Sequence, residues 1–302
     1  MRILVLGGTG YLGRHVAERL RALPGAHLLA AGRNGAAEFG ADLARDRPER
    51  LAETLAAAAP DAVVNCAGAT GGDAVALAET NARGPAVLCA ALRAAAPTAR
   101  LVHLGSAAEY GPGTPGEPVA ESSPACPVTP YGATKLAGTL AVTSAALDAV
   151  VLRVGNPVGP GAPPASLPGR LAALLRPAAR DPDAVLRLGD LSAHRDFVDV
   201  RDVARAVESA VTAPAPLPPV LNIGGGQALP VRRVAHGLAR LAGFRGRLEE
   251  GAGGAAGSAR SAAVSWQCSD ISAAADALGW RPVHSLDDSL AALWAATLER
   301  VP

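Results

Sequence analysis

Arg2-Ile3-Leu4-Val5-Leu6-Gly7-Gly8-Thr9-Gly10-Tyr11-Leu12-Gly13 is the stretch that decides the fold of this 302-residue chain. Its beginning is a short apolar run, typical of a strand buried on both faces of a parallel sheet. The glycines follow at once, and an amphipathic helix is predicted from about Leu12 to Leu23. A strand, a glycine loop and a helix N-terminus in succession form an anion site, because exposed backbone N–H groups and the helix dipole favour a pyrophosphate.

The second predicted strand, His27 to Ala31, is followed by Gly32-Arg33-Asn34. Cofactors without a 2′-phosphate are usually held at this place by an Asp or a Glu on the ribose hydroxyls. Arg33 can instead pair with a 2′-phosphate, and a charge-assisted contact of about 1.5–3 kcal/mol would favour NADP(H) over NAD(H) by roughly 10- to 100-fold. The alternative is that Arg33 is a solvated loop residue.

Further βα units follow along the chain. We expect helices near Arg50 to Ala59, Gly84 to Ala95 and from Tyr131, and strands at Asp61 to Ala67, Arg100 to Gly105 and Ala149 to Val154. This alternation is the pattern of an α/β, doubly wound parallel sheet, whose ligands lie at the carboxyl ends of the strands. Four polar residues fall just after predicted strands or at a helix start, namely Asn65, Asn81, Ser106 and Asn156.

Tyr131-Gly132-Ala133-Thr134-Lys135 contains the only lysine in the sequence, since every other basic side chain apart from histidine is arginine. Thr129-Pro130 provides a cap and a first-turn proline, and a helix is predicted to run through Leu147. Residues i and i+4 share one helix face, so Tyr131 and Lys135 should point the same way. A compact ammonium beside a phenol indicates chemistry, whereas the alternative is an accidental pair on a surface helix.

Composition and charge exclude several classes of protein. With 49% hydrophobic and 18% charged residues the chain is globular, and a net charge of +1 without a basic run makes nucleic acid an unfavoured partner. The apolar start is too short for a signal peptide or a membrane span, so we expect no membrane association and a cytoplasmic location. The four cysteines are scattered, which predicts no disulfide framework and no metal site.

The motifs together resemble the extended short-chain dehydrogenase/reductases, the epimerase/dehydratase group that acts on nucleotide sugars. The resemblance covers nearly the full length and rests on the glycine loop, Asn81, Ser106, Tyr131 to Lys135, Arg195-Asp196-Phe197-Val198-Asp199-Val200-Arg201-Asp202 and Leu278-Gly279-Trp280-Arg281-Pro282. It implies a Rossmann-type domain over 1–155, to which 196–226 return. A smaller substrate-binding lobe would comprise 156–195 and 227–302.

The resemblance also implies roles for individual residues. Tyr131 would donate or accept the proton, Lys135 would support it and bind the ribose, Ser106 would hydrogen-bond the reacting oxygen, and Asn81 would hold a water against Lys135. For Asn81 a helix cap is the alternative. The candidate cofactor contacts are Gly7, Thr9, Gly10, Tyr11, Leu12, Gly13, Arg33, Asn34, Asp42, Leu43, Cys66, Ala67, Gly68 and Lys135.

The residues after Ser106 help to choose the reaction. The 4,6-dehydratases that the chain resembles carry an Asp-Glu pair there, whereas this chain has Ala107-Ala108, which disfavours dehydration. Glu109 is interpreted as a structural acid. Epimerisation needs only the Ser, Tyr and Lys and stays open, but Arg33 favours an exchangeable NADPH. The pattern is most similar to the 4-keto-6-deoxy-sugar reductases.

The substrate contacts that the resemblance implies are Ala107, Ala108, Asn156, Arg195 and Arg260, with pairing to Asp196 or Asp199 as the alternative for Arg195. The segment 251–263 is rich in Gly, Ala and Ser and is expected to be a flexible linker or lid. Few aromatic residues are available to stack on a base, so a ketoreductase of non-nucleotide natural products is a second hypothesis. A non-catalytic NADP(H) sensor is a third, and Tyr131 and Lys135 speak against it.

A homodimer is predicted from the helix that begins at Tyr131. This helix is apolar nearly all round, with Leu136, Leu140, Val142 and Leu147, which a helix with one wet face would not need. We expect it to pack in the dimer together with the helix around Val87 to Leu92.

Overall fold

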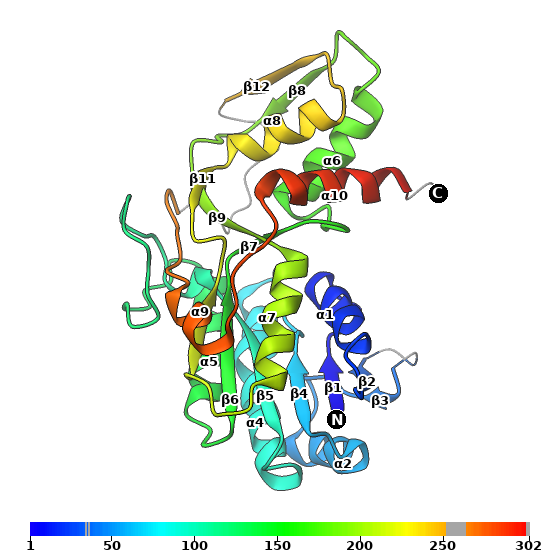
Figure 1. The fold of residues 1–302 in the computed structure, drawn as a ribbon, viewed down its shortest axis with the longest axis vertical. Coiled ribbons are helices and arrows are strands. Elements are labelled where there is room, and N and C mark those ends of the chain that lie inside the picture. The colour runs from blue at the N-terminus through cyan, green and yellow to red at the C-terminus, as the bar shows by residue number, and fades with distance from the viewer. Residues whose placement is uncertain (34, 36, 252–263, 300–302) are drawn as a thin grey trace.

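The computed structural model describes all residues except 34, 36, 252–263 and 300–302. A parallel sheet of seven strands has the order β10-β6-β5-β4-β1-β2-β3 (Figure 1). The strands are β1 (Arg2–Leu6), β2 (His27–Gly32), β3 (Phe39–Gly40), β4 (Ala62–Asn65), β5 (Arg100–Ser106), β6 (Ala149–Val154) and β10 (Val220–Ile223). Since β1 pairs with both β2 and β4, the strand order reverses at β1, and ligands of such sheets bind at that reversal.

Helices cover both faces of the sheet, as the predicted doubly wound fold requires. One face carries α1 (Tyr11–Arg21), α7 (Val200–Thr212) and α9 (Ser272–Leu278). The other carries α2 (Pro48–Ala58), α4 (Gly84–Ala95) and α5 (Pro130–Thr143). Shorter pieces are α3 (Ala74–Ala78), the π-helix η1 (Glu79–Arg83) and the 3₁₀-helix η2 (Ala107–Glu109). Within the described residues, no helix has the length and apolar character needed to span a bilayer.

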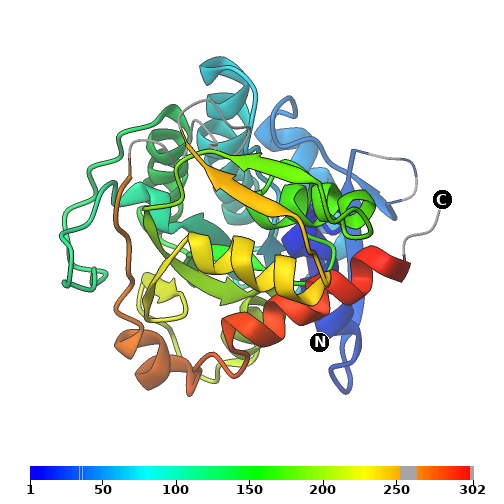
Figure 2. The same ribbon diagram turned by 90° about the horizontal axis from the view of Figure 1, so that it is seen from above.

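A smaller lobe stands at the carboxyl ends of the strands and, seen from above, lies over them (Figures 1 and 2). It contains α6 (Leu167–Ala178), α8 (Arg232–Leu241), α10 (Leu286–Glu299) and the two-stranded pair β8 (Val185–Leu188) and β12 (Arg247–Glu250). Its core includes Leu171, Leu175, Val234, Leu238 and Leu290. Between the two bodies, β7 (Asn156–Val158), β9 (His194–Asp199) and β11 (Ala228–Pro230) form a three-stranded sheet.

Two segments bear on the predicted boundary between the two bodies. β9 joins the three-stranded sheet, and its Val198 packs with β10 and α7 in the core on the α1 face of the seven-stranded sheet. Residues around α9 also pack in this core, where Ala274 and Trp280 are buried. We therefore propose a boundary at which both 200–223 and 271–280 belong to the body that contains the seven-stranded sheet.

The helix predicted to reach Leu147 is shorter. α5 ends at Thr143, and the Oγ of Ser144 donates to the Leu140 carbonyl at 2.7 Å. Ala146 then has φ +53°, a left-handed conformation that turns the chain into β6. The end of the helix is thus set by a local hydrogen bond and a turn, which a run of apolar residues does not reveal.

Candidate active site

The glycine loop lies at the carboxyl end of β1, against the loop that follows β4. Gly7 has φ +75°, and a Cβ there would lie 2.6 Å from the Ala67 nitrogen. A Cβ on Gly13 would collide with the Gly7 carbonyl oxygen. Gly10 is the N-cap of α1 without a side-chain cap, and the first turn holds no acid. The start of α1 therefore fits the diphosphate of a dinucleotide.

Three other residues of this loop differ in their surroundings. Thr9 is exposed, whereas Leu12 packs against the core beneath α1. The hydroxyl of Tyr11 donates to the Gly159 carbonyl at 3.3 Å, and burial raises the pKa of Tyr11. Tyr11 thus connects the start of α1 to the segment after β7.

Arg33 follows β2 and lines a cavity of about 460 Å³. The other lining residues are Asp42, Ala44, Arg45, Ala76, Glu79 and Thr80. Among the described residues, neither Arg33 nor Arg45 forms an ion pair. Leu43 is buried in the core between the sheet and the helices α2, α4 and α5, and Asn34 lies outside the described residues. The cavity thus brings two arginines and two acids together near the carboxyl end of β2.

The loop after β4 is held from two sides. The Ala67 N–H donates to Asn65 Oδ1 at 3.0 Å, and Asn65 in turn lies 3.1 Å from His103 Nδ1 on β5. His103 is buried, its Nε2 has no partner among the described residues, and burial lowers its pKa well below the ordinary value. Burial also raises the pKa of Cys66 to about 12, which keeps this thiol protonated and inert at neutral pH.

Ser106 ends β5 and caps η2. Its Oγ accepts from the Ala108 N–H at 3.2 Å, and its own N–H donates to Glu109 at 2.7 Å, which completes a capping box. A Cβ on Gly132 in the first turn of α5 would lie 2.5 Å from the Ala108 carbonyl oxygen. The glycine therefore lets α5 approach the segment that carries Ser106.

Lys135 is buried beside β5, one helical turn after the half-buried Tyr131. Its Nζ donates to the Leu104 carbonyl at 2.6 Å, two residues before Ser106. Burial lowers the pKa of Lys135, and Glu109 and Cys66 oppose that shift. The structure thus gathers Ser106, Tyr131 and Lys135 at the carboxyl end of β5, next to the glycine loop.

Asn81 lies inside the π-helix η1, a kind of helical bulge that is frequent at functional sites. Its side chain accepts from the Ala69 N–H and donates to the Ala69 carbonyl, both at 2.9 Å, and it donates to Thr134 at 3.3 Å. A Cβ on Gly68 would lie 3.3 Å from Asn81 Oδ1 and 4.0 Å from Lys135 Nζ. Asn81 therefore holds the loop after β4 close to Lys135 and is not a helix cap.

Glu109 is fully buried and its carboxylate is occupied. One oxygen accepts from the Ser106 N–H, and the other accepts from Arg153 at 2.7 Å and from Thr139 at 2.8 Å. These contacts support a structural role for this acid. Ala107 and Ala108 occupy the two positions before it and carry no acid-base group.

The predicted substrate contacts are distributed over the lobe and its edge. Asn156 begins β7 and is half-buried, whereas Arg195 on β9 is buried and donates to the His194 and Val264 carbonyls. Burial lowers the pKa of Arg195. Arg260 and most of the segment 251–263 lie outside the described residues. These two bonds tie the Arg195 side chain to the backbone of β9 and of the segment that leads to Gln267.

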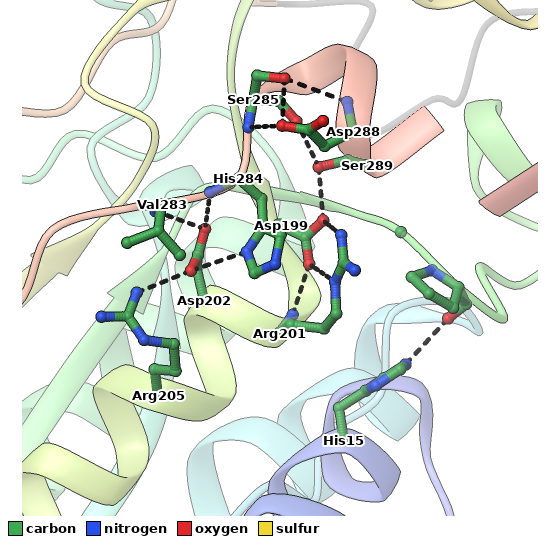
Figure 3. Close-up of polar contacts among 12 residues, drawn as sticks. His15, Asp199, Arg201, Asp202, Arg205, Val283, His284, Ser285, Asp288 and Ser289 are labelled. Atoms are coloured by element: carbon green, nitrogen blue, oxygen red, sulfur yellow. Dashed lines mark hydrogen bonds and ion pairs between the residues drawn. The ribbon is translucent and has the colours of Figure 1, made fainter. Parts of the chain in front are cut away.

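The motif Asp199-Val200-Arg201-Asp202 connects α7 to the start of α10 (Figure 3). Asp199 accepts from Arg201 at 2.8 Å and from Ser289 at 2.6 Å. Asp202 accepts from the N–H groups of Val283 and His284 and from Arg205. His15, also labelled in Figure 3, has its Nε2 at 2.9 Å from the Pro160 carbonyl oxygen. The motif therefore joins the lobe to the sheet and contributes no side chain to the Ser106 region.

Gln267 is a site residue that sequence reasoning missed. Its Nε2 donates to the Ala107 carbonyl at 2.8 Å, next to Ser106. A signal was present, because the chain holds only two glutamines, Gln227 and Gln267, and scarcity had already singled out Lys135. Arg45 was missed as well, although Asp42 and Leu43 of the same loop after β3 were predicted to contact the cofactor.

A glycine loop at the switch point of a parallel sheet, beside a serine, a tyrosine and a buried lysine, defines a dinucleotide-dependent oxidoreductase of the short-chain dehydrogenase/reductase class. The family model described as "NAD dependent epimerase/dehydratase family" matches residues 3–224. The chain belongs to this family, and it is an NAD(P)-dependent enzyme.

Individual relatives agree with this assignment. The chain is 39% identical over 307 residues to the dTDP-6-deoxy-L-talose 4-dehydrogenase (NAD(P)(+)) of Kitasatospora kifunensis, covering 98% of this chain and 95% of the relative. Among solved structures, RMD from Pseudomonas aeruginosa complexed with NADPH has a TM-score of 0.82 at 26% identity, with 99% of each chain covered. MoeE5 in complex with UDP-glucuronic acid and NAD has a TM-score of 0.84 at 26% identity, with 100% of each chain covered.

Proposed function

We propose that the chain is an NADPH-dependent ketoreductase that reduces the 4-keto group of a nucleotide-activated 6-deoxyhexose. The observation that carries the proposal is the set of Ser106, Tyr131 and Lys135 at the end of β5, combined with alanines at 107 and 108. The similarity to a dTDP-6-deoxy-L-talose 4-dehydrogenase supports the substrate class and the position of the reacting carbon. Oxidation of a 4-hydroxyl and reduction of the 4-ketone are the two directions of one reaction.

The cofactor site fits a dinucleotide on this chain's own geometry. The glycine loop and the uncapped start of α1 would hold the diphosphate, and Lys135 would reach a ribose hydroxyl. Bound NADPH supplies the hydride. Arg33, with the nearby Arg45, offers a place for a 2′-phosphate, which supports NADPH over NADH.

Tyr131 would protonate the oxygen of the reduced carbonyl. When hydride adds to the carbonyl carbon, the electron pair of the C=O bond moves to oxygen, and that oxygen takes the phenol proton. A phenol pKa of about 10 must fall by about three units, or roughly 4 kcal/mol, to act near pH 7. The Lys135 ammonium, held by the Leu104 carbonyl, has the charge that would stabilise a phenolate at Tyr131. Ser106 Oγ would hydrogen-bond the same oxygen.

Dehydration is disfavoured because it needs an acid and a base beside the sugar ring. Ala107 and Ala108 supply neither, and Glu109 is fully engaged with Arg153, Thr139 and the Ser106 N–H. Simple reduction requires one proton donor, which Tyr131 provides.

The proposal is tested by following NADPH consumption with a purified dTDP-4-keto-6-deoxyhexose. We expect NADPH consumption that requires the nucleotide, and a loss of at least 100-fold in kcat for Tyr131→Phe. Tyr110→Phe is the matched control, because the Tyr110 hydroxyl donates to Asn222 at 2.8 Å and has no part in the reaction. It should lose stability but keep kcat within a few-fold.

Other outcomes point to the alternatives. If NADPH is consumed only with a ketone that carries no nucleotide, the substrate class is natural-product ketones and not nucleotide sugars. Interconversion of two dTDP-hexoses without net NADPH consumption would indicate a 4-epimerase. Full activity of Tyr131→Phe would contradict the enzyme mechanism.

A further inference from the structure

Gln267 lies between the residue that follows Ser106 and the first residue of β7. Its Nε2 donates to the Ala107 carbonyl at 2.8 Å, and its Oε1 accepts from Asn156 Nδ2 at 3.3 Å. The same Nδ2 donates to the Asp196 carbonyl at 3.2 Å. Gln267 is 8% exposed, so these contacts are shielded from water. The two amides therefore form a short chain between two backbone carbonyls.

The orientation of both amides follows from the ends of this chain. A backbone carbonyl can only accept, so the Gln267 atom that faces the Ala107 carbonyl must be its NH₂ group. Its oxygen then faces Asn156, which must present its own NH₂ to that oxygen and to the Asp196 carbonyl. Neither amide can be flipped without leaving two acceptors in contact.

Gln267 itself is held by the backbone on either side. Its N–H donates to the His194 carbonyl at 3.2 Å, and the Ser269 N–H donates to Asp196 Oδ2 at 2.9 Å. Residues 267–269 thereby follow β9, a strand of the sheet between the two bodies. The backbone position of Gln267 is thus fixed by hydrogen bonds that do not involve its side chain.

This arrangement leaves the Oδ1 atom of Asn156 available to a ligand. Both hydrogens of its Nδ2 are used, and no hydrogen bond among the described residues uses its Oδ1. Asn156 is half-buried, so a ligand can reach it. An amide oxygen accepts hydrogen bonds only, so it can bind a hydroxyl but not an ionised phosphate, which carries no donor.

We propose that Gln267 is a positioning residue that orients Asn156 as the acceptor for a hydroxyl of the hexose, and that Asn156 does not bind the diphosphate. The hexose is favoured over the nucleoside because Gln267 joins Asn156 to Ala107, the neighbour of Ser106, where the reacting sugar must lie. This inference rests on the proposed nucleotide-sugar substrate.

Binding measurements with dTDP and with dTDP-L-rhamnose, in the presence of saturating NADP⁺, test this assignment by calorimetry. Asn156→Ala should lower the affinity for dTDP-L-rhamnose by about 3- to 10-fold, which corresponds to the loss of one hydrogen bond, and should change the affinity for dTDP by less than about twofold. Gln267→Leu, of similar size, should show the same selective loss, because the released Asn156 amide can rotate. Gln267→Met serves if the leucine variant does not fold.

A structural defect would lower the affinities for both ligands together, so the ratio of the two affinities is the informative quantity. Equal losses for dTDP and dTDP-L-rhamnose in Asn156→Ala would overturn the assignment and place Asn156 on the nucleotide or its phosphates. Unchanged binding of both ligands would overturn it too. If the wild-type chain binds neither ligand, the substrate class fails and the inference fails with it, whereas a failed inference alone leaves wild-type binding intact.

Discussion

Lys135 shows how a single side chain can serve both packing and chemistry. Its ammonium is buried beside β5, and it is held by one carbonyl at 2.6 Å. Burial lowers its pKa, while the charge of the buried Glu109 opposes that shift. An arginine would need space for a planar fork with five donors, which a single carbonyl cannot satisfy. This explains why lysine persists at 135 in a chain that uses arginine everywhere else.

At the same scale, Arg33 and Arg45 should determine the choice of cofactor. Both line the cavity at the β2 end of the sheet, and neither forms an ion pair among the described residues. We expect Arg33→Ala to lower the preference for NADPH over NADH by roughly 10- to 100-fold, and Arg45→Ala, which removes the second arginine of the same cavity, to lower it as well.

The preference is measured as the ratio of kcat/KM values for the two cofactors, and directly as the affinity for 2′,5′-ADP against 5′-AMP. Arg21→Ala, an exposed arginine at the far end of α1, is the control and should leave both ratios unchanged. A wild-type ratio near one, or an Arg33→Ala ratio equal to that of the wild type, would contradict the role of Arg33.

At the scale of elements, the parts that could be predicted from sequence are those fixed by local pattern. The strands β5 and β6 and the helix α4 have strong apolar patterns with clear breaks, and their predicted bounds agree with the structure to within a residue. Ser106 and Lys135 could be placed because strand ends and helix faces follow from periodicity. The amide chain of Ala107, Gln267 and Asn156 could not, because it joins three segments that lie more than a hundred residues apart in sequence at its two Gln267 contacts.

Asp196, like the amide chain, joins separate segments, because its carboxylate connects β9 to the backbone at Gly225 and at Ser269. Its carboxylate accepts from the Gly225 N–H at 2.6 Å and from the Ser269 N–H at 2.9 Å. Burial nevertheless dominates and raises the pKa of Asp196 from an ordinary value of 3.8 to about 6. The folded protein therefore binds this proton more tightly than the unfolded chain does.

The sign of the resulting pH dependence follows from linkage. Between about pH 4 and 6 the folded state holds more protons at this site, so the contribution of Asp196 to the free energy of unfolding falls as the pH rises. A shift of this size corresponds to a loss on the order of 3 kcal/mol, complete above the folded pKa. We expect Asp196→Asn, whose amide does not titrate, to lose this decline.

Urea unfolding at half-unit steps from pH 4 to 8 gives the difference in unfolding free energy between the wild type and Asp196→Asn at each pH. That difference should change steadily in favour of the variant up to about pH 6 and then level off. Asp276→Asn, at an exposed position of α9, should give a flat difference. A flat difference for Asp196→Asn would show that its pKa is not raised.

At the scale of the whole molecule, the helices α4 and α5 present the surface that we propose for a homodimer. Val87, Leu88 and Leu92, which were expected to form part of it, are buried inside the protomer. Leu140 on α5 is instead 59% exposed, and the small residues Ala86 and Ala137 are exposed on the same two helices. A contact between two copies would therefore depend on Leu140, with small neighbours that allow close approach of the helices.

Light scattering at micromolar concentration should find a dimer for the wild-type chain. Burying a leucine is worth about 1.5–3 kcal/mol, and a two-fold contact counts it twice, so a charge at this position should favour the monomer. We expect Leu140→Glu to be monomeric and Val283→Glu, at a residue that is 64% exposed outside these helices, to stay dimeric. A monomeric wild type would contradict the proposal, and a dimeric Leu140→Glu would place the interface on another face. Since α5 also carries Tyr131 and Lys135, a true dimer contact here should make the activity per protomer fall on dilution below the dissociation constant.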